Sequence, residues 1–413
     1  MLLFATAGLS RLLNGPTRAA LLMVASLLFY ATAVPAHALL IVALLTGVWL
    51  LGDWLQAPTG DDPTALSHRR IGLGAGIAVC AGVLAYFKYA DFFRDSLRAL
   101  APSLWPTRLT SPSAAATWGV PLGISFFTFE FIHYLVDAYR RQLQPPDTAL
   151  ATPAAQPATP LQRYLHFAAF ALFFPTLLAG PIKRFQQFRG TAPVGRADVA
   201  YGLSRIVLGL TKKILIADSA ASLAIRLQIP DQVTPLGLWI AMYAYAVQIY
   251  FDFSGYSDLA IGAARLLGYR VPENFDWPYL ASDLSQFWRR WHISLSGWIR
   301  DDRYIPLGGN RRGRARTACN AIVVMSICGL WHGPAWHFVA WGAWHGIGLA
   351  VTQQFARWTA PNHNGESSPH WIRRVGSTLL TFHYVCFGWI LFAAPSLPAA
   401  ATAFARMLGF AAR

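Results

Sequence analysis

Charged residues are scarce in this sequence of 413 residues. Asp, Glu, Lys and Arg together make up 13% of the chain, while hydrophobic residues make up 55%. In soluble globular proteins about a quarter of the residues are charged, so this composition excludes a soluble globular protein. Apolar stretches recur instead at about 20 residues, the length with which a helix crosses a bilayer. The chain is therefore predicted to be an integral membrane protein.

Acidic residues are especially few, with 19 Asp and Glu against 34 Lys and Arg, which gives a formal net charge of +15. Such a surplus can indicate nucleic-acid binding, but here the basic residues lie between the apolar stretches rather than on one soluble face. In a multi-pass membrane protein, Lys and Arg gather in short cytoplasmic loops and fix the orientation of the chain. We therefore interpret the charge as a topology signal and expect no nucleic-acid partner.

The common signatures of metal sites, disulfides and serine nucleophiles are missing. No HExxH motif occurs, and the histidines at 332, 337 and 345 do not have the i, i+4 spacing of a helical zinc site. No GxSxG elbow is present. The few cysteines show no CxxC spacing and lie within or beside apolar stretches, which argues against a disulfide framework; they are Cys80, Cys319, Cys328 and Cys386. We expect no bound metal.

The apolar stretches predict an all-α, polytopic fold with eight to eleven crossings in one integral domain, residues 1–413. Several stretches carry Gly or Pro, so some are expected to be re-entrant, which a membrane protein tolerates only where protein or a wet cavity surrounds the backbone. The polar linkers, 52–70, 141–162 and 359–370, are too short for a second folded domain. The candidate segments are 19–51 (split near Pro35), 71–90, 118–137, 164–182, 200–225, 235–251, 253–268, 319–331, 336–353, 374–393 and 397–411.

His332 is the first candidate for chemistry. It follows an uncharged run at 321–330, and no Asp or Glu occurs between Arg303 and Gly365. A histidine buried without an acidic partner stays neutral, and a neutral imidazole can act as a general base toward a hydroxyl. Gly333 and Pro334 are expected to end the helix at this point. The alternative is a histidine that is hydrogen-bonded in a helix interface.

Two further histidines lie in tryptophan-rich sequence. His292 follows Trp-Arg-Arg-Trp and precedes Ile-Ser-Leu-Ser, a setting typical of a membrane interface. It is expected either to orient a substrate or to be an ordinary interfacial residue. His345 lies between Gly342 and Gly346, which permit close helix contact, so a packing role is favoured there. His337 is expected at a helix start rather than in catalysis.

Acidic residues inside apolar sequence form a second group of candidates. Asp252 and Asp258 lie six residues apart, and Glu130 lies three residues before His133. Ionisable residues within membrane segments are usually functional or paired. These acids are therefore expected either to pair with arginine or to assist a histidine.

Eight segments together resemble the bacterial branch of the membrane-bound O-acyltransferases. This branch includes the alginate O-acetylation protein, the D-alanyl transferase of teichoic acid modification and the peptidoglycan O-acetylation protein. The segments that carry the resemblance, in chain order, are 87–89, 121–134, 179–185, 248–258, 287–296, 304–311, 329–333 and 341–346.

The resemblance implies a ring of transmembrane helices around a thin centre that a tunnel crosses. It places the invariant histidine of the family at His332 and the second histidine at His292. It also implies an acyl thioester, acetyl-CoA or an acyl carrier protein, as the cytoplasmic substrate, with no further cofactor. One departure leaves the donor open: residues 300–303 read Arg-Asp-Asp-Arg where the family usually reads Arg-Asp-Tyr-Leu.

The expected function is therefore a multi-pass enzyme of the cell inner membrane that moves an acyl group to hydroxyls of an extracytoplasmic polysaccharide. Acetyl is favoured over D-alanyl. A separate periplasmic or surface acyltransferase is the expected partner, because the chain has no large soluble domain to hold a polymer. The alternatives are a transporter or channel for a small solute, and a scaffold that recruits soluble enzymes.

An arginine-rich segment joins two of the histidine motifs, with eight arginines against two aspartates between Arg289 and Arg316. Anchoring to anionic lipid headgroups is one interpretation, worth on the order of 1 kcal/mol per residue. The other is docking of an anionic donor, because the guanidinium fork suits phosphates and carboxylates. The candidate docking residues are Arg311, Arg312 and Arg314.

Overall fold

The structure, a computed structural model, describes residues 1–13, 15–58, 62–102, 118–143, 159–188, 194–299, 313–358 and 370–410. Within these ranges the regular structure is helical, apart from one isolated antiparallel bridge between Phe275 and Trp291. The all-α prediction is confirmed for this part of the chain.

The chain forms two compact units. The first comprises Met1–Ile206 and Leu259–Pro272, and the second comprises Val207–Asp258 and Glu273–Arg413. All three histidines in the tryptophan-rich segments belong to the second unit.

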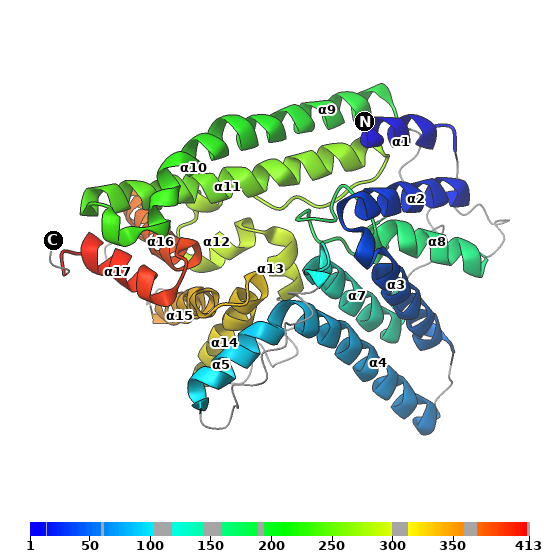
Figure 1. Cartoon of the computed structure of the whole chain (residues 1–413), viewed down its shortest axis with the longest axis horizontal. Coiled ribbons are helices and arrows are strands. Elements are labelled where there is room, and N and C mark those ends of the chain that lie inside the picture. Colours follow the sequence, from blue (N-terminus) through cyan, green and yellow to red (C-terminus); the bar gives the residue numbers. More distant parts are fainter. Residues whose placement is uncertain are drawn as a thin grey trace. The chain divides into compact units, whose positions relative to one another are not determined.

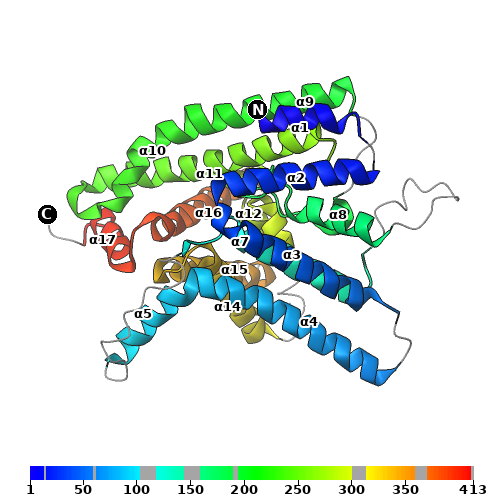
Figure 2. The same ribbon diagram turned by 45° about the vertical axis from the view of Figure 1, so that its right-hand side comes forward.

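The first unit is built on the helices α1 to α8, and prolines define several of their starts. Pro35 begins α3 directly after α2 ends, as the sequence predicted, because proline fits the first turn of a helix but not its interior. In both views α2 lies beside α8, and α3 and α4 pack against α7 (Figures 1 and 2). The helices are α1 (Leu2–Ser10), α2 (Gly15–Ala33), α3 (Pro35–Gln56), α4 (Pro63–Leu84), α5 (Ala90–Leu100), α7 (Ile124–Tyr139) and α8 (Pro160–Ala171).

The second unit contains the helices that follow α9 (Arg196–Leu210) in the chain. The exception is the last part of the long helix α11, from Leu259, which belongs to the first unit. A π-helical stretch, Thr211–Ala217, continues α9. The helices are α10 (Asp218–Ala224), α11 (Pro235–Leu266), α12 (Leu284–Arg290), α13 (Ile293–Ile299), α14 (Arg314–His332), α15 (Trp336–Trp358), α16 (His370–Ala393) and α17 (Leu397–Met407).

Two boundary predictions are wrong. The polar linker expected at 52–70 is largely helical, because α3 continues to Gln56 and α4 begins at Pro63. The segments 235–251 and 253–268 were expected to be separate, but α11 is one helix of 32 residues. Asp252 lies within this helix, and its carboxylate is 2.8 Å from the Lys213 ammonium. Gly255 does not break it either, because this glycine provides close contact: a Cβ there would lie 2.9 Å from the Gly209 carbonyl oxygen.

Four helical stretches among the described residues are long and apolar enough to cross a bilayer: Gly15–Ala33, Pro35–Gln56, Pro63–Leu100 and Trp371–Ala393. Large apolar side chains on them face outward, including Leu39, Val79 and Leu380. An outer surface of this kind is stable in lipid rather than in water. The chain is therefore a helical membrane protein.

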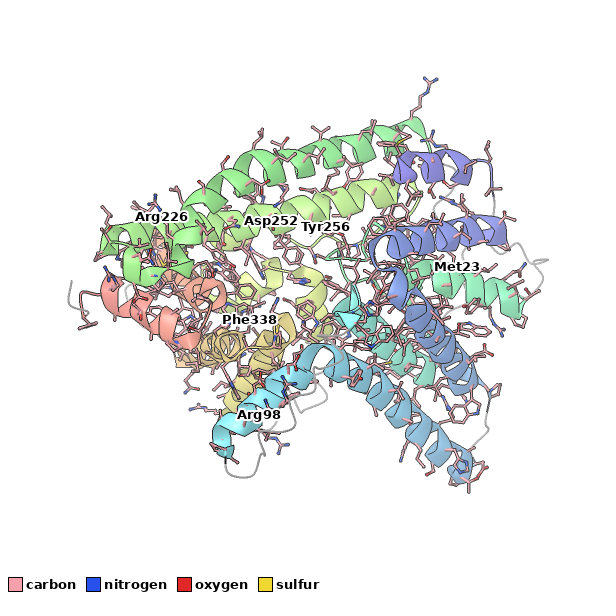
Figure 3. The ribbon with its side chains drawn as sticks, viewed as in Figure 1. Met23, Arg98, Arg226, Asp252, Tyr256 and Phe338 are labelled. Atoms are coloured by element: carbon pink, nitrogen blue, oxygen red, sulfur yellow. The ribbon has the colours of Figure 1, made fainter. Side chains whose placement is uncertain are left out.

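The pair α14 and α15 is held together by glycine. Cβ atoms built at Gly329 and Gly342 would run into the backbone of the opposite helix, at the carbonyls of Phe338 and Met325. Phe338 is labelled near the start of α15 in Figure 3. Small residues of this kind allow two helix backbones to approach closely in a membrane. The contact fixes the C-terminal end of α14 against α15.

We predict that Gly342→Ala separates α14 from α15 and lowers the stability of the protein by about 1–3 kcal/mol, the usual cost of overpacking. The measurement is thermal unfolding of the detergent-solubilised protein. Gly376→Ala in α16 is the control, because a Cβ at that position meets open space. Equal unfolding temperatures for the two variants would contradict the proposed contact.

Candidate active site

His332 is the last residue of α14, and its ring lies in a half-buried aromatic pocket. The ring centroids of Trp331, Trp341 and Phe392 lie 4.8, 5.1 and 5.1 Å from that of His332. The helix ends here because Gly333 is extended and Pro334 follows it. The prediction that these two residues terminate the helix is confirmed.

His292 lies between α12 and α13 in a left-handed backbone conformation, with φ of 46°. Its side chain is 1% exposed, and its ring stands edge-on to Phe253 at 4.7 Å. Neither of its ring nitrogens has a hydrogen-bond partner among the described residues. A histidine in this region of backbone space costs about 1–3 kcal/mol and persists only where its surroundings enforce it.

One indole links the two predicted catalytic histidines. The Trp331 ring lies 4.8 Å from His332 and 6.4 Å from His292, measured between centroids. The structure therefore brings together the end of α14 and the link between α12 and α13, which are distant in the sequence. Sequence analysis identified both histidines but not the tryptophan between them.

His345 is fully buried inside the same aromatic region. Trp341 contacts it at 5.0 Å, and Trp288 stands edge-on to it at 5.2 Å. Its ring nitrogens find no hydrogen-bond partner in the described ranges. Trp341 thus touches both His345 and His332, and the surroundings of His345 favour the packing role that the flanking glycines predicted.

His337 lies in the first turn of α15, as expected, and its Nδ1 is 3.0 Å from the Leu391 carbonyl oxygen.

The acidic candidates are paired with lysine. Lys212 donates to Asp258 at 2.7 Å, and Lys213 lies 2.8 Å from Asp252. Asp252 is labelled on α11 in Figure 3. In the first unit, buried Lys183 donates to buried Glu130 at 2.7 Å, and His133 pairs with Asp137 rather than with Glu130. These contacts favour a structural role for the three acids.

A cavity of about 300 Å³ lies among α12, α13, α14 and α15. Its walls are mainly apolar and include Trp288, Ile293 and Met325, with Arg289 and Gln353 among the few polar groups. Ile293 directly follows His292, and Trp288 is the residue that stands against His345. The cavity therefore adjoins the aromatic region that holds the histidines.

Arg314 is exposed at the first position of α14, at the opposite end of this helix from His332. At 1.5 Å per residue the two ends are about 27 Å apart. The cavity wall at Ala321, Val324 and Met325 lies on α14 between them. Arg311 and Arg312 lie outside the described residues.

Comparison with known proteins identifies the family of this chain. Residues 118–392 match the model of the membrane-bound O-acyltransferase family, a range that contains all three histidines. The chain belongs to this family. It is therefore a membrane O-acyltransferase, and the enzyme class that the motifs implied is confirmed.

Three of its curated relatives are named for acyl transfer to alginate, to peptidoglycan and to teichoic acid. A probable alginate O-acetylase of Pseudomonas putida is 38% identical over 94% of this chain and 74% of its own length. A peptidoglycan O-acetyltransferase of Helicobacter pylori is 33% identical over 83% and 66% of the two chains. A teichoic acid D-alanyltransferase of Bacillus subtilis is 30% identical over 66% and 68%.

We predict that His345→Leu keeps most of the acyltransferase activity. Replacing a buried group that has no hydrogen-bond partner by an apolar one of similar size is close to neutral. The measurement is acyl incorporation into the envelope polymer, normalised to the amount of protein in the membrane, with His332→Ala measured beside it. A large loss of activity at an unchanged unfolding temperature would instead place the His345 imidazole in the chemistry.

Proposed function

We propose that this O-acyltransferase takes an acyl group from a cytoplasmic thioester and passes it toward hydroxyls of an extracytoplasmic polysaccharide. The observation that carries the proposal is the Trp331 indole, which brings His332 and His292 into one aromatic site. The enzyme would be a multi-pass protein of the cell inner membrane, organised as one domain with eight to eleven helices around a tunnel.

In the proposed reaction, neutral His332 accepts the proton of an acceptor hydroxyl as its oxygen attacks the thioester carbonyl. The carbon–sulfur bond breaks, the new ester forms, and the leaving thiolate takes the proton back from the imidazolium. No net proton is gained or lost. His292 orients the donor or the acceptor beside Trp331.

The donor is proposed to enter from the end of α14 that carries Arg314. The cavity lies on α14 between this charged end and His332, and an apolar cavity with a few polar groups suits a slender organic chain. Arg311, Arg312 and Arg314 would hold the phosphates of CoA or the acidic surface of an acyl carrier protein. The donor is a substrate, and no further cofactor is needed.

Acetyl is the favoured group, because the relatives that match most of this chain are named as O-acetylases. D-alanyl is the second candidate, since a teichoic acid D-alanyltransferase is also similar. Mass spectrometry of the envelope polymer with and without the gene separates the two by the mass of the added group. A separate periplasmic or surface acyltransferase is proposed to complete delivery to the polymer.

We predict that His332→Ala lowers acyl incorporation by about 10²–10⁴-fold, the usual contribution of general-base catalysis. The assay is polymer acylation in cells, with the amount of membrane protein measured in parallel. Unchanged acylation at normal protein levels would exclude His332 as the base.

A further prediction concerns the three candidate docking arginines. Reversing the charge of Arg311, Arg312 and Arg314 to Glu is expected to weaken donor binding by at least about tenfold, because charge-assisted hydrogen bonds are replaced by repulsion. Binding of acetyl-CoA and of an acyl carrier protein is measured separately, with topology checked by reporter fusions. The same reversal at exposed Arg373 and Arg374 is the control. Donor affinity equal to that of the control would leave only lipid anchoring.

A further inference from the structure

The unusual backbone conformation of His292 is not stabilised by its own side chain. A left-handed φ of 46° is uncommon for a residue with a Cβ. The imidazole contributes no hydrogen bond to a described residue that would hold this conformation. The contacts that stabilise this conformation must therefore be made by the residues that adjoin His292 in the chain.

Asn274 makes these contacts through three hydrogen bonds. Its carbonyl oxygen accepts a hydrogen bond from the Ile293 amide at 2.9 Å. Its side-chain Oδ1 accepts two more, from the Ser294 amide at 3.2 Å and from the Ser294 hydroxyl at 2.7 Å. Asn274 is completely buried, so water does not compete for these bonds. The two residues after His292 are thus fixed to one side chain and its backbone.

The other end of the same amide reaches α11. The Nδ2 of Asn274 donates to the hydroxyl of buried Ser257 at 3.5 Å. Ser257 precedes Asp258, which Lys212 holds, and α11 also carries Phe253, the ring that stands against His292. Asn274 therefore connects the His292 backbone to the helix that forms one wall around the His292 ring. The connection needs an acceptor and a donor on one side chain, which an amide has.

We infer that Asn274 is a positioning residue for His292, which sets the direction of the imidazole toward Trp331 without touching the reacting groups. The inference rests on the role proposed for His292. Without the hydrogen bonds from Ser294 to the Asn274 side chain, we expect the backbone of His292 to relax toward negative φ, which moves the ring away from Trp331. A misplacement of about 1 Å can cost about 100-fold in rate.

The test compares the initial rate of acyl incorporation into the envelope polymer for Asn274→Ala and Ser294→Ala, each with His292 present and with His292→Ala. We expect a loss of about 100-fold for Asn274→Ala. For Ser294→Ala, which removes the hydroxyl that donates to Asn274 and leaves the Ser294 amide in place, we expect about tenfold. In the His292→Ala background neither substitution should lower the rate further, because residues that act through one group are not additive.

Ser254→Ala is the matched control. Ser254 lies one turn before Ser257 on α11 and is equally buried, but its hydroxyl has no hydrogen-bond partner within the described part of the chain. Its rate should equal that of the unmodified protein. Unfolding temperatures are measured for all variants, and Ser294→Ala serves in place of Asn274→Ala if the latter does not fold.

The outcomes separate the inference from the proposed function. A normal rate for His292→Ala would overturn the proposed role of His292, and the inference with it. A slow His292→Ala that Asn274→Ala slows further by the same factor would overturn the inference alone, since Asn274 would then act independently of His292. If His292→Ala is too slow to measure, Ser294→Ala decides. A normal rate for it overturns the inference, and a reduced rate at an unchanged unfolding temperature supports it.

Discussion

The close approach of α14 and α15 is the constraint on which the site depends. Three glycines make it possible, because a Cβ at Gly329, Gly342 or Gly346 would meet the backbone of the opposite helix. His332 ends the first of these helices, while Trp341 and His345 belong to the second. If the helices stood farther apart, Trp341 would lose contact with His332. The glycines around the histidines are therefore part of the site, although none of them carries chemistry.

Sequence analysis predicted what depends on local chemistry. The break at Pro35 and the end of α14 at His332 follow from what proline and glycine do to a helix backbone. The candidate histidines followed from the cost of an imidazole in apolar sequence. These features need no knowledge of distant contacts. The helix boundary expected near Asp252 was wrong, since α11 continues through this residue and the Asp252 carboxylate pairs with Lys213 from another segment.

Contacts between residues that are distant in the sequence could not be predicted in this way. Trp331 contacts His292, and Asn274 fixes the residues after His292, yet neither contact has a periodicity that marks it in the sequence. An asparagine after a proline and a glutamate reads as an ordinary turn residue. Its importance appears only when its burial and its hydrogen bonds to Ser294 and Ser257 are known.

The acidic side chains of α11 form ion pairs with lysine, whereas the histidines pack among aromatic rings. Carboxylates on α11 are held by Lys212 and Lys213, and aromatic rings pack against His332 and His345. Indole rings fix the position of an imidazole without fixing its charge. In the proposed reaction, positioning of His332 by tryptophan, with Asn274 acting on the backbone of His292, would therefore leave the His332 imidazole able to take up and release a proton.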